Sequence, residues 1–207
     1  MRERGERGDG VRVAEDPFDR FREWYEEACR DPRGEVPEAM CLSTVDEKGR
    51  PDARFVLLKG FDERGFVFYT NTNSPKARQM EGNPAVALTI YWERFRRQVR
   101  IRGRAEPVSE KEADEYFATR PRVSRLGAWA SEQSQPLKSR FTLLRRVAVA
   151  ARRFGTGEVP RPPFWSGYRV VPETIEFWSE GVFRLNDRII FRRDQEGRGW
   201  SATRLYP

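Results

Sequence analysis

The chain has 207 residues, with 39 Lys or Arg against 32 Asp or Glu, which gives a formal net charge of +7. This length suits one domain with a substantial core, and the charge favours anionic ligands, although acidic and basic residues alternate along most of the chain. Histidine is absent, which excludes Ser-His-Asp and Cys-His triads, histidine-bound metals and an imidazole proton shuttle. Cys29 and Cys41 are too few for a disulfide framework or a structural zinc site, so no metal site is expected. An enzyme of this composition relies on Lys, Arg, Tyr or carboxylates, or takes its chemistry from a cofactor.

No apolar run is long enough to span a bilayer, and the charged N-terminus lacks the apolar segment of a signal peptide. We therefore expect a cytoplasmic protein without a membrane partner. Residues 1–15 are charged and rich in glycine, which predicts a disordered N-terminal arm ahead of a single domain over residues 16–207.

The first half of this domain alternates between helical and strand patterns. Asp16 and Pro17 start a predicted helix whose apolar stripe would pack over a sheet, and residues 31–34 end it. Strands are then expected at residues 40–45, 53–61, 66–70, 85–92 and 98–108. Five short antiparallel strands joined by small loops predict a closed or nearly closed barrel.

The second half adds helices and further strands. Ser109 and Glu112 form a capping box, which predicts a helix to residue 119, and Pro121 then forces a bend. A long amphipathic helix with a basic stripe is expected over residues 136–154. The remaining strands are expected at residues 168–171, 175–178, 188–192 and 200–205. The predicted fold class is mainly β with flanking α-helices.

The segment at residues 52–78 combines a predicted hairpin with a short helix that opens at Ser74. Arg54 and Lys59 lie inside an otherwise apolar strand, and Lys76 falls in the first turn of the helix, whose free N–H groups and positive dipole end attract phosphate. Hydroxyl groups that could bind the same ligand belong to Tyr69, Thr70 and Ser74. The pattern predicts a site for a phosphate-bearing ligand. The alternative is that Lys59 only extends to solvent from an edge strand.

A second group of polar residues surrounds the predicted bend. Tyr116 and Arg120 lie four residues apart on one face of a helix, and Ser124 follows the bend. A phenol, a guanidinium and a hydroxyl could together bind a phosphate monoester, whereas a surface arginine beside a core tyrosine is the alternative. Gln98, at the start of a strand, has an amide that could read the edge of a heterocycle or stabilise the preceding turn.

Ordered motifs extend over residues 16–207. They are RFVLLK at 54–59, FYTN at 68–71, S-x-K-A at 74–77, RQV at 97–99, YFATRPRVSRLGAWAS-x-QS at 116–134, FW-x-G-x-R at 164–169, IEFW at 175–178 and RL-x-DR at 184–188. In this order they resemble the pyridoxine/pyridoxamine 5′-phosphate oxidase family. The resemblance implies an FMN-binding split β-barrel that works as a homodimer with the flavin at the subunit interface. It also implies oxidation of pyridoxamine or pyridoxine 5′-phosphate to pyridoxal 5′-phosphate, with O2 as electron acceptor and H2O2 as the second product.

The same resemblance implies the site residues. The flavin ligands would be Arg54, Phe55, Val56, Leu57, Leu58, Lys59, Tyr69, Thr70, Lys76, Gln98, Gln133, Ser134, Trp178 and Arg188. The substrate would be bound by Lys59, Tyr116, Arg120, Ser124, Arg184 and Asn186. Arg184 would lie against the pyridine ring, as the expected catalytic residue. In an ideal strand Arg54 and Lys59 face opposite sides, so a shared site requires a bulge or a ligand that straddles the strand.

Three departures from the family pattern bear on affinity and substrate identity. Pro75 stands where the family usually has an arginine that reaches the flavin phosphate, Asn186 replaces a substrate-contacting histidine, and the N-terminal arm lacks an Arg-Arg-x-Tyr segment. One alternative is therefore a flavin oxidase of the same fold acting on another substrate, such as a phenazine precursor. Outside this class, the chain could be a flavin carrier or a basic nucleic-acid-binding module, whereas the oxidase interpretation expects no nucleic-acid partner.

Overall fold

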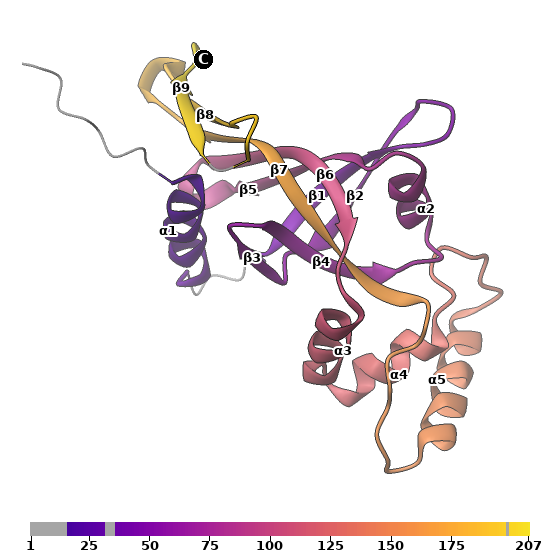
Figure 1. Ribbon diagram of the computed structural model, residues 1–207. Helices are drawn as coiled ribbons and strands as arrows, with labels where there is room; N and C mark the ends of the chain where they lie inside the picture. The colour runs from indigo at the N-terminus through magenta and orange to yellow at the C-terminus, as the bar shows by residue number, and fades with distance from the viewer. Residues whose placement is uncertain (1–15, 32–35, 198) are drawn as a thin grey trace, which may run out of the picture.

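Nine antiparallel strands form one sheet with the path β2-β1-β5-β6-β7-β4-β3, and β8 and β9 extend it from β7 (Figure 1). The computed structural model describes residues 16–31, 36–197 and 199–207, so the predicted disordered arm lies outside the described residues. The strands are β1 (Ala39–Val45), β2 (Pro51–Leu57), β3 (Gly60–Asp62), β4 (Gly65–Asn71), β5 (Ala85–Trp92), β6 (Arg97–Pro107), β7 (Trp165–Ser179), β8 (Asp187–Arg193) and β9 (Trp200–Arg204). The helices are α1 (Pro17–Cys29), α2 (Pro75–Gly82), α3 (Glu110–Thr119), α4 (Arg122–Ala130) and α5 (Arg140–Phe154), with 3₁₀ turns η1 (Glu93–Phe95) and η2 (Val182–Arg184).

The sheet curls into a split barrel because its two edge strands are consecutive in the chain. β2 and β3 lie at opposite ends of the strand path, and only two residues separate them. The amide of Leu58 donates to the carbonyl of Glu38, ahead of β1, at 2.8 Å, whereas the next amide, of Lys59, donates to Val67 in β4 at 2.8 Å. The chain therefore crosses from one sheet edge to the other at this point. The expected single strand over residues 53–61 is wrong, but the nearly closed barrel is confirmed.

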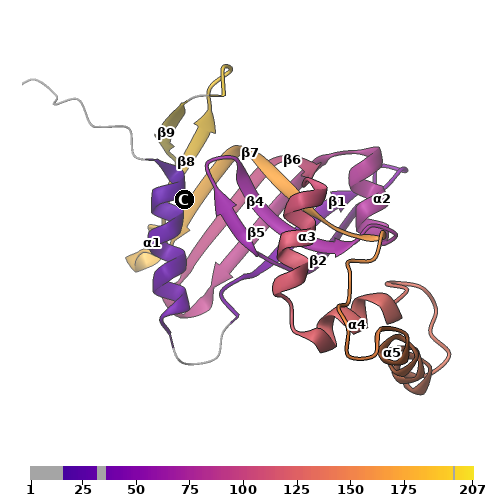
Figure 2. The same ribbon diagram turned by 60° about the horizontal axis from the view of Figure 1, so that its bottom comes forward.

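Helix α1 lies across one end of the barrel (Figure 2), and its buried side chains join an aromatic core. It begins where the Asp16 carboxylate accepts a hydrogen bond from the amide of Phe18 at 2.7 Å, with Pro17 in the first turn. Phe21 is fully buried, and its ring centroid lies 4.9 Å from that of Phe66 in an edge-to-face contact. Burial of one such side chain contributes about 1.5–3 kcal/mol, so this stripe anchors the helix on the sheet.

Strand β7 is continuous, although two strands were expected at residues 168–171 and 175–178. Pro172 marks the point where the strand would be interrupted, but β6 shifts its register there, between Arg102 and Gly103. A side chain at Gly103 would place its Cβ 2.0 Å from the carbonyl oxygen of Val171, so glycine permits the close approach of the two backbones. The resulting long strand runs from the helical end of the molecule to β8 and β9 (Figure 1).

The remaining helices gather at the end of the barrel opposite to α1 (Figure 2). A bend is expected at Pro121, and the structure shows in addition that Pro121 is the N-cap of a further helix, α4, which the sequence pattern did not predict. Helix α5 begins at Arg140 rather than at residue 136, since Ser139 is its N-cap and accepts from the amide of Thr142 at 3.3 Å. Among the described helices, none has the length and apolar character needed to cross a membrane.

Candidate active site

A half-buried cation, Lys76, lies where β4 leads into α2. The Lys76 ammonium group donates to Thr70 Oγ1 at 3.2 Å, to Ser74 Oγ at 3.2 Å and to Gln133 Oε1 at 2.9 Å. Ser74 is fully buried and is the N-cap of α2, with Pro75 in the first turn. Burial, together with the positive charge of Arg54, lowers the pKa of Lys76. Three predicted flavin ligands, Thr70, Lys76 and Gln133, therefore meet around a poorly solvated ammonium group that an anion would stabilise.

Arg54 is held beside this cluster by groups from β1, β2 and α2. Its guanidinium donates to Thr44 Oγ1 at 2.6 Å and to Gln79 Oε1 at 3.1 Å, and it also pairs with Asp52. The neighbouring predicted ligands differ in exposure: Phe55 and Leu57 are exposed, Val56 is half-buried and Leu58 is buried. Arg54 and Lys76 are thus two cations close enough for the charge of Arg54 to lower the pKa of Lys76.

A second cation lies on a stack of aromatic rings. The rings of Tyr116 and Tyr69 are parallel, with centroids 4.0 Å apart, and Tyr69 stacks in turn on Trp165 at 5.2 Å. Gly167 permits this stack, because a Cβ there would lie 2.7 Å from the Tyr69 ring. The guanidinium carbon of Arg120 is 4.8 Å from the centroid of Trp165, which is a cation–π contact.

Arg120 has an incomplete set of hydrogen bonds. Its Nη1 atom is buried and has no hydrogen-bond partner within the described part of the chain. Burial lowers the pKa of Arg120, against the influence of Tyr116. The backbone of Arg120 is extended because Pro121 follows it, and this places Ser124 in the first turn of the next helix. A buried donor without an acceptor is costly, so this position fits an anionic ligand.

One cavity of about 360 Å³ connects the two groups of residues. Its lining includes Tyr69, Thr70, Arg120, Ser124, Gln133 and Trp165. The volume lies within the range of small-molecule sites in proteins. Predicted flavin ligands and predicted substrate ligands therefore line the same space.

Lys59 lies at the crossing between β2 and β3, outside both strands. The expectation that a shared site requires a bulge or a ligand that straddles the strand assumed one continuous strand, whereas β2 ends at Leu57, between Arg54 and Lys59. The Lys59 ammonium group is 3.8 Å from Glu38 Oε1, and both side chains are partly exposed.

Other predicted ligands form a row across the far end of the sheet. Gln98 pairs in register with Trp178, and Trp178 pairs with Arg188. Arg188 is held by an ion pair with Glu176 at 2.8 Å. Ser166, the partner of Thr70, and Trp178 belong to the same strand, β7, and the thirteen residues from one to the other give a contour length of roughly 40 Å. Within one protomer the row and the cavity therefore lie at opposite ends of β7.

The predicted substrate residues Arg184 and Asn186 belong to this remote group. They lie between β7 and β8, and Arg184 has a φ of 65°, as part of a tight turn. The Asn186 side chain accepts a hydrogen bond from the amide of Gly181 at 3.2 Å, which closes the turn. Phe183, at the tip, is 91% exposed. Ser134 lies beside Gln133 in the exposed loop between α4 and α5, with a φ of 68°.

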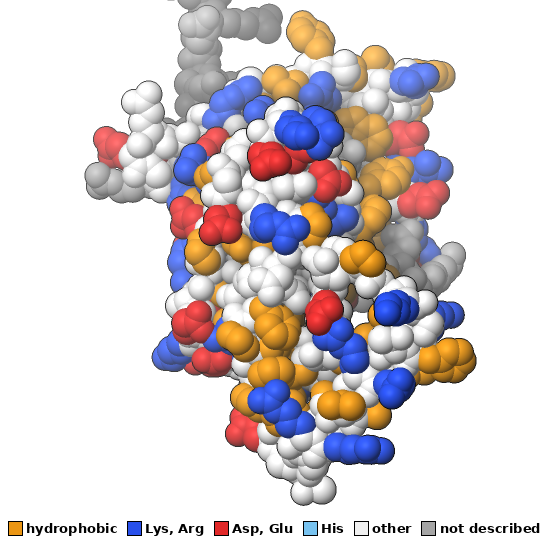
Figure 3. Space-filling model, turned by 90° about the vertical axis from the view of Figure 1, so that its right-hand side faces the viewer, with side chains coloured by type: hydrophobic (Ala, Val, Ile, Leu, Met, Phe, Trp, Pro, Cys, Tyr) orange, Lys and Arg blue, Asp and Glu red, His pale blue; other side chains and the backbone are white. Residues whose placement is uncertain are grey.

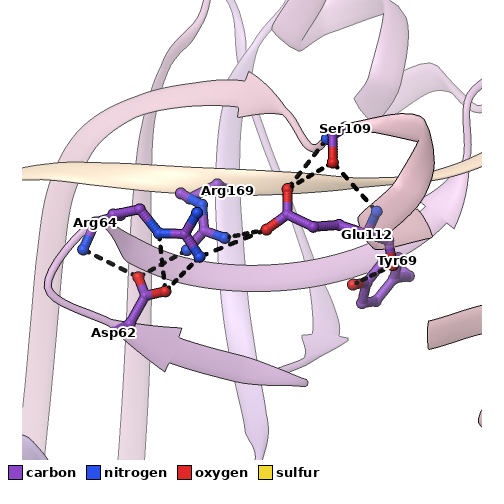
Figure 4. A network of polar contacts seen from close by, with 6 residues as sticks. All are labelled: Asp62, Arg64, Tyr69, Ser109, Glu112 and Arg169. Carbon is purple, nitrogen blue, oxygen red and sulfur yellow. Dashed lines mark hydrogen bonds and ion pairs between the residues drawn. The ribbon is translucent and has the colours of Figure 1, made fainter. Parts of the chain in front are cut away.

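A network of charges fastens α3, which carries Tyr116, to the sheet (Figure 4). Arg169 of β7 donates to Asp62 and to Glu112, each at 2.8 Å. Glu112 also completes the capping box with Ser109, and its carbonyl oxygen accepts from the Tyr69 hydroxyl at 3.4 Å. The amide of Ser109, with Arg169, holds the pKa of Glu112 below its ordinary value. Trp165 and Arg169 belong to the FW-x-G-x-R motif. Only the structure shows that Trp165 stacks on Tyr69 and that Arg169 pairs with Asp62 and Glu112.

The chain matches the family described as pyridoxamine 5′-phosphate oxidase over residues 26–153, and the pyridoxine 5′-phosphate oxidase C-terminal dimerisation region over residues 165–207. A pyridoxine/pyridoxamine 5′-phosphate oxidase from Azorhizobium caulinodans is 53% identical over 195 residues, which cover 94% of this chain and 92% of that protein. A protein of the same name from Caulobacter vibrioides is 56% identical over 193 residues, covering 93% of this chain and 86% of that protein.

Solved structures show the same fold. PhzG from Burkholderia lata 383, in complex with tetrahydrophenazine-1-carboxylic acid, is 31% identical, with a TM-score of 0.85, and the match covers 93% of each chain. A pyridoxamine 5′-phosphate oxidase-related, FMN binding protein from Nostoc punctiforme is 18% identical, with a TM-score of 0.75, over 94% of this chain and 100% of that chain; at this identity it is a likeness of fold alone. The extent of the sequence matches shows that the chain belongs to the pyridoxine/pyridoxamine 5′-phosphate oxidase family.

Proposed function

We propose that the protein oxidises pyridoxamine 5′-phosphate, and also pyridoxine 5′-phosphate, to pyridoxal 5′-phosphate, with FMN as cofactor, O2 as electron acceptor and H2O2 as product. With the amine substrate, water supplies the aldehyde oxygen and ammonia is released. The observation that carries this proposal is the cavity that Thr70 and Gln133 share with Arg120 and Ser124. Arg120 lines this cavity, and Lys76 lies behind Thr70 and Gln133, to which it donates hydrogen bonds, so two separate cations adjoin the same space. Two phosphate-bearing molecules, the cofactor and the substrate, would each require one.

The residues around Lys76 suit the phosphate of FMN. Thr70 and Ser74 supply hydroxyls, and Lys76 and Arg54 supply positive charge at the start of α2. FMN, when bound, would accept a hydride equivalent from the substrate and pass the electrons to O2. The protein would contribute binding, orientation and exclusion of water, which is consistent with a chain that has no histidine.

Arg120, Tyr116, Ser124 and Lys59 suit the phosphate of the substrate. The unpartnered Nη1 of Arg120 would gain an acceptor, and the stack of Trp165, Tyr69 and Tyr116 fixes the direction in which Arg120 and Tyr116 point. A charge-assisted contact of this kind contributes about 1.5–3 kcal/mol. These residues would therefore set the position of the pyridine ring without taking part in proton transfer.

We further propose that the active unit is a homodimer with each site built from two protomers. Gln98, Trp178 and Arg188 form one row, but this row lies near the opposite end of β7 from Ser166, which pairs with Thr70, a contour of roughly 40 Å along the strand. A single FMN molecule cannot reach both groups in one protomer, whereas a partner could bring its own row to the cavity. The row also lies largely within the region that matches the C-terminal dimerisation model. Arg184 and Asn186 of the partner would then approach the substrate.

Oxidation of a phenazine precursor is the second candidate. The replacement of a histidine by Asn186 favours it, and the PhzG structure shares the fold at 31% identity. The relatives named as pyridoxine/pyridoxamine 5′-phosphate oxidases are closer in sequence, at 53–56% identity. A nucleic-acid-binding role has less support, because basic side chains alternate with acidic and apolar ones over the face that carries α2 and α5 (Figure 3).

The decisive experiment measures O2 consumption and H2O2 release by the FMN-loaded protein. We expect turnover with pyridoxamine 5′-phosphate and with pyridoxine 5′-phosphate, and a large loss of kcat/KM with unphosphorylated pyridoxamine. Turnover of a dihydrophenazine carboxylic acid without turnover of either phosphate would support the second candidate. Absence of bound flavin and of all turnover would refute both.

A further inference from the structure

The carboxylate of Glu38 lies next to Lys59, one of the residues assigned to the substrate phosphate. Glu38 directly precedes β1, and its carbonyl oxygen accepts a hydrogen bond from Leu58 at 2.8 Å, so its backbone is fixed beside the crossing between β2 and β3. Its Oε1 atom is 3.8 Å from the ammonium nitrogen of Lys59, and the two side chains are 30% and 28% exposed. Among the predicted phosphate ligands, Lys59 is thus paired with an acidic residue of the same chain.

Glu38 and Lys59 lie close to the tyrosine stack. The amide of Lys59 donates to the carbonyl of Val67 in β4, and Val67 packs with Tyr69 on the side of β4 that faces α3. Tyr69 stacks in turn on Tyr116. The electrostatic influence of Glu38 reaches the same place, because burial and then the negative charge of Glu38 raise the pKa of Tyr116 against the opposite influence of Arg120.

The two cations of the substrate-phosphate group therefore differ in their surroundings. Arg120 has a buried Nη1 without a hydrogen-bond partner in the described chain, whereas Lys59 already has a carboxylate as its neighbour. A phosphate monoester carries a charge of about −1.5 to −2 at neutral pH, so Glu38 repels it and cancels one of the two positive charges that attract it. A phosphate that approaches Lys59 therefore meets the negative charge of Glu38 at the same ammonium group.

We propose that Glu38 competes with the substrate phosphate for Lys59 and so limits the affinity of the site for phosphorylated ligands, product included. This inference rests on the proposed function. It assigns to Glu38 a role in tuning affinity, outside the contacts with the reacting atoms. The consequence for turnover is a higher KM and a faster release of the phosphorylated product than the cations alone would produce.

The test measures binding of 4-deoxypyridoxine 5′-phosphate, which lacks the group to be oxidised, to the FMN-loaded protein by equilibrium dialysis. Glu38→Gln keeps the size of the side chain and removes its charge. We expect the Kd of the phosphorylated analogue to fall by about two- to fivefold, the range that a partly exposed ion pair represents. The Kd of unphosphorylated 4-deoxypyridoxine should stay unchanged, and kcat for pyridoxamine 5′-phosphate should not fall.

Glu47→Gln is the matched control, because Glu47 is an exposed carboxylate in the turn between β1 and β2. It should leave both Kd values unchanged, and melting temperatures report whether each variant is folded. The inference is overturned if the Kd of the phosphorylated analogue is unchanged or higher in both Glu38→Gln and Glu38→Ala. It is also overturned if the Kd values of both analogues change equally, or if the parent protein binds neither analogue. Because the analogue is not oxidised, this result is independent of whether the protein catalyses the proposed reaction.

Discussion

The guanidinium of Arg120 lies 4.8 Å from the ring centroid of Trp165, while its buried Nη1 atom lacks a hydrogen-bond partner in the described chain. The indole ring of Trp165 contacts the guanidinium but accepts no hydrogen bond from Nη1, so this donor remains available to a ligand. A ligand anion would satisfy them at little cost in reorganisation, because Arg120 is already desolvated and oriented.

Arg120→Ala should raise the KM for pyridoxamine 5′-phosphate strongly and leave FMN binding nearly intact. Loss of a charge-assisted contact of about 1.5–3 kcal/mol corresponds to a change of about 10- to 150-fold. Steady-state kinetics and a fluorescence titration with FMN measure the two effects. Arg145→Ala, at an exposed position of α5, is the control and should change neither. If Arg120→Ala loses flavin instead, the assignment of Tyr116, Arg120 and Ser124 to the substrate phosphate is wrong.

Lys76→Met should weaken FMN binding by about 10- to 150-fold and change riboflavin binding far less. The parent protein should prefer FMN to riboflavin, because Lys76, Arg54 and the hydroxyls of Thr70 and Ser74 address a phosphate. Quenching of flavin fluorescence gives both dissociation constants. Lys138→Met serves as the control, since Lys138 is exposed in the loop before α5. Equal affinities of the parent for the two flavins would contradict the phosphate site at the start of α2.

Much of the fold follows from local patterns in the sequence. Alternating apolar residues predicted β5 and β6 closely, because a strand with one buried face has a period of two. The crossing at Leu58 and Lys59 could not be predicted, since apolar residues continue through it and the change of partner strand involves distant segments. Pro121 was interpreted as a bend because a proline can end one helix or begin the next with the same local geometry.

The site was less accessible to sequence reasoning than the strands. Spacing alone brought Tyr116 and Arg120 to one helix face, and the hairpin pattern indicated a phosphate site near Lys76. The aromatic support from Trp165 and the carboxylate of Glu38 beside Lys59 depend on contacts between segments far apart in the chain. The alignment of Gln98 with Trp178 and Arg188 requires the register of three strands, which no local pattern determines.

Acid should weaken the link between α3 and the sheet through Glu112. Its pKa is lowered from the ordinary value of 4.5, chiefly by the Ser109 amide. Between the lowered folded pKa and the unfolded pKa, the unfolded state binds more protons, so stability rises with pH. The contribution of Glu112 is therefore complete above about pH 5 and is lost as the pH falls through the folded pKa.

Glu112→Gln isolates this contribution. Glutamine also completes a capping box, but it cannot titrate and cannot form an ion pair with Arg169. We expect the variant to be less stable by about 1 kcal/mol at neutral pH, and its stability to fall less than that of the parent on acidification. Denaturant unfolding followed by circular dichroism between about pH 3 and pH 7 measures both. Glu115→Gln, which alters an exposed pair with Lys111, is the control. If the free energy of unfolding falls equally with decreasing pH in Glu112→Gln and in the parent, Glu112 has the same pKa in the folded and unfolded states.

Heterodimers carrying different tags can show whether each site takes residues from both protomers. If Lys76 of one protomer and Arg188 of its partner share a site, a dimer of a Lys76→Met chain with an Arg188→Ala chain keeps one intact site and about half of the parent activity. A dimer of the parent with the double variant should then be inactive, because each of its sites contains one altered residue. If each site lies within one protomer, the two results are reversed, since only the dimer with the parent chain would keep an intact site. The heterodimers are purified through both tags, and their bound FMN and O2 consumption are measured to distinguish the two arrangements. If the sites are shared, removal of FMN should also weaken the dimer.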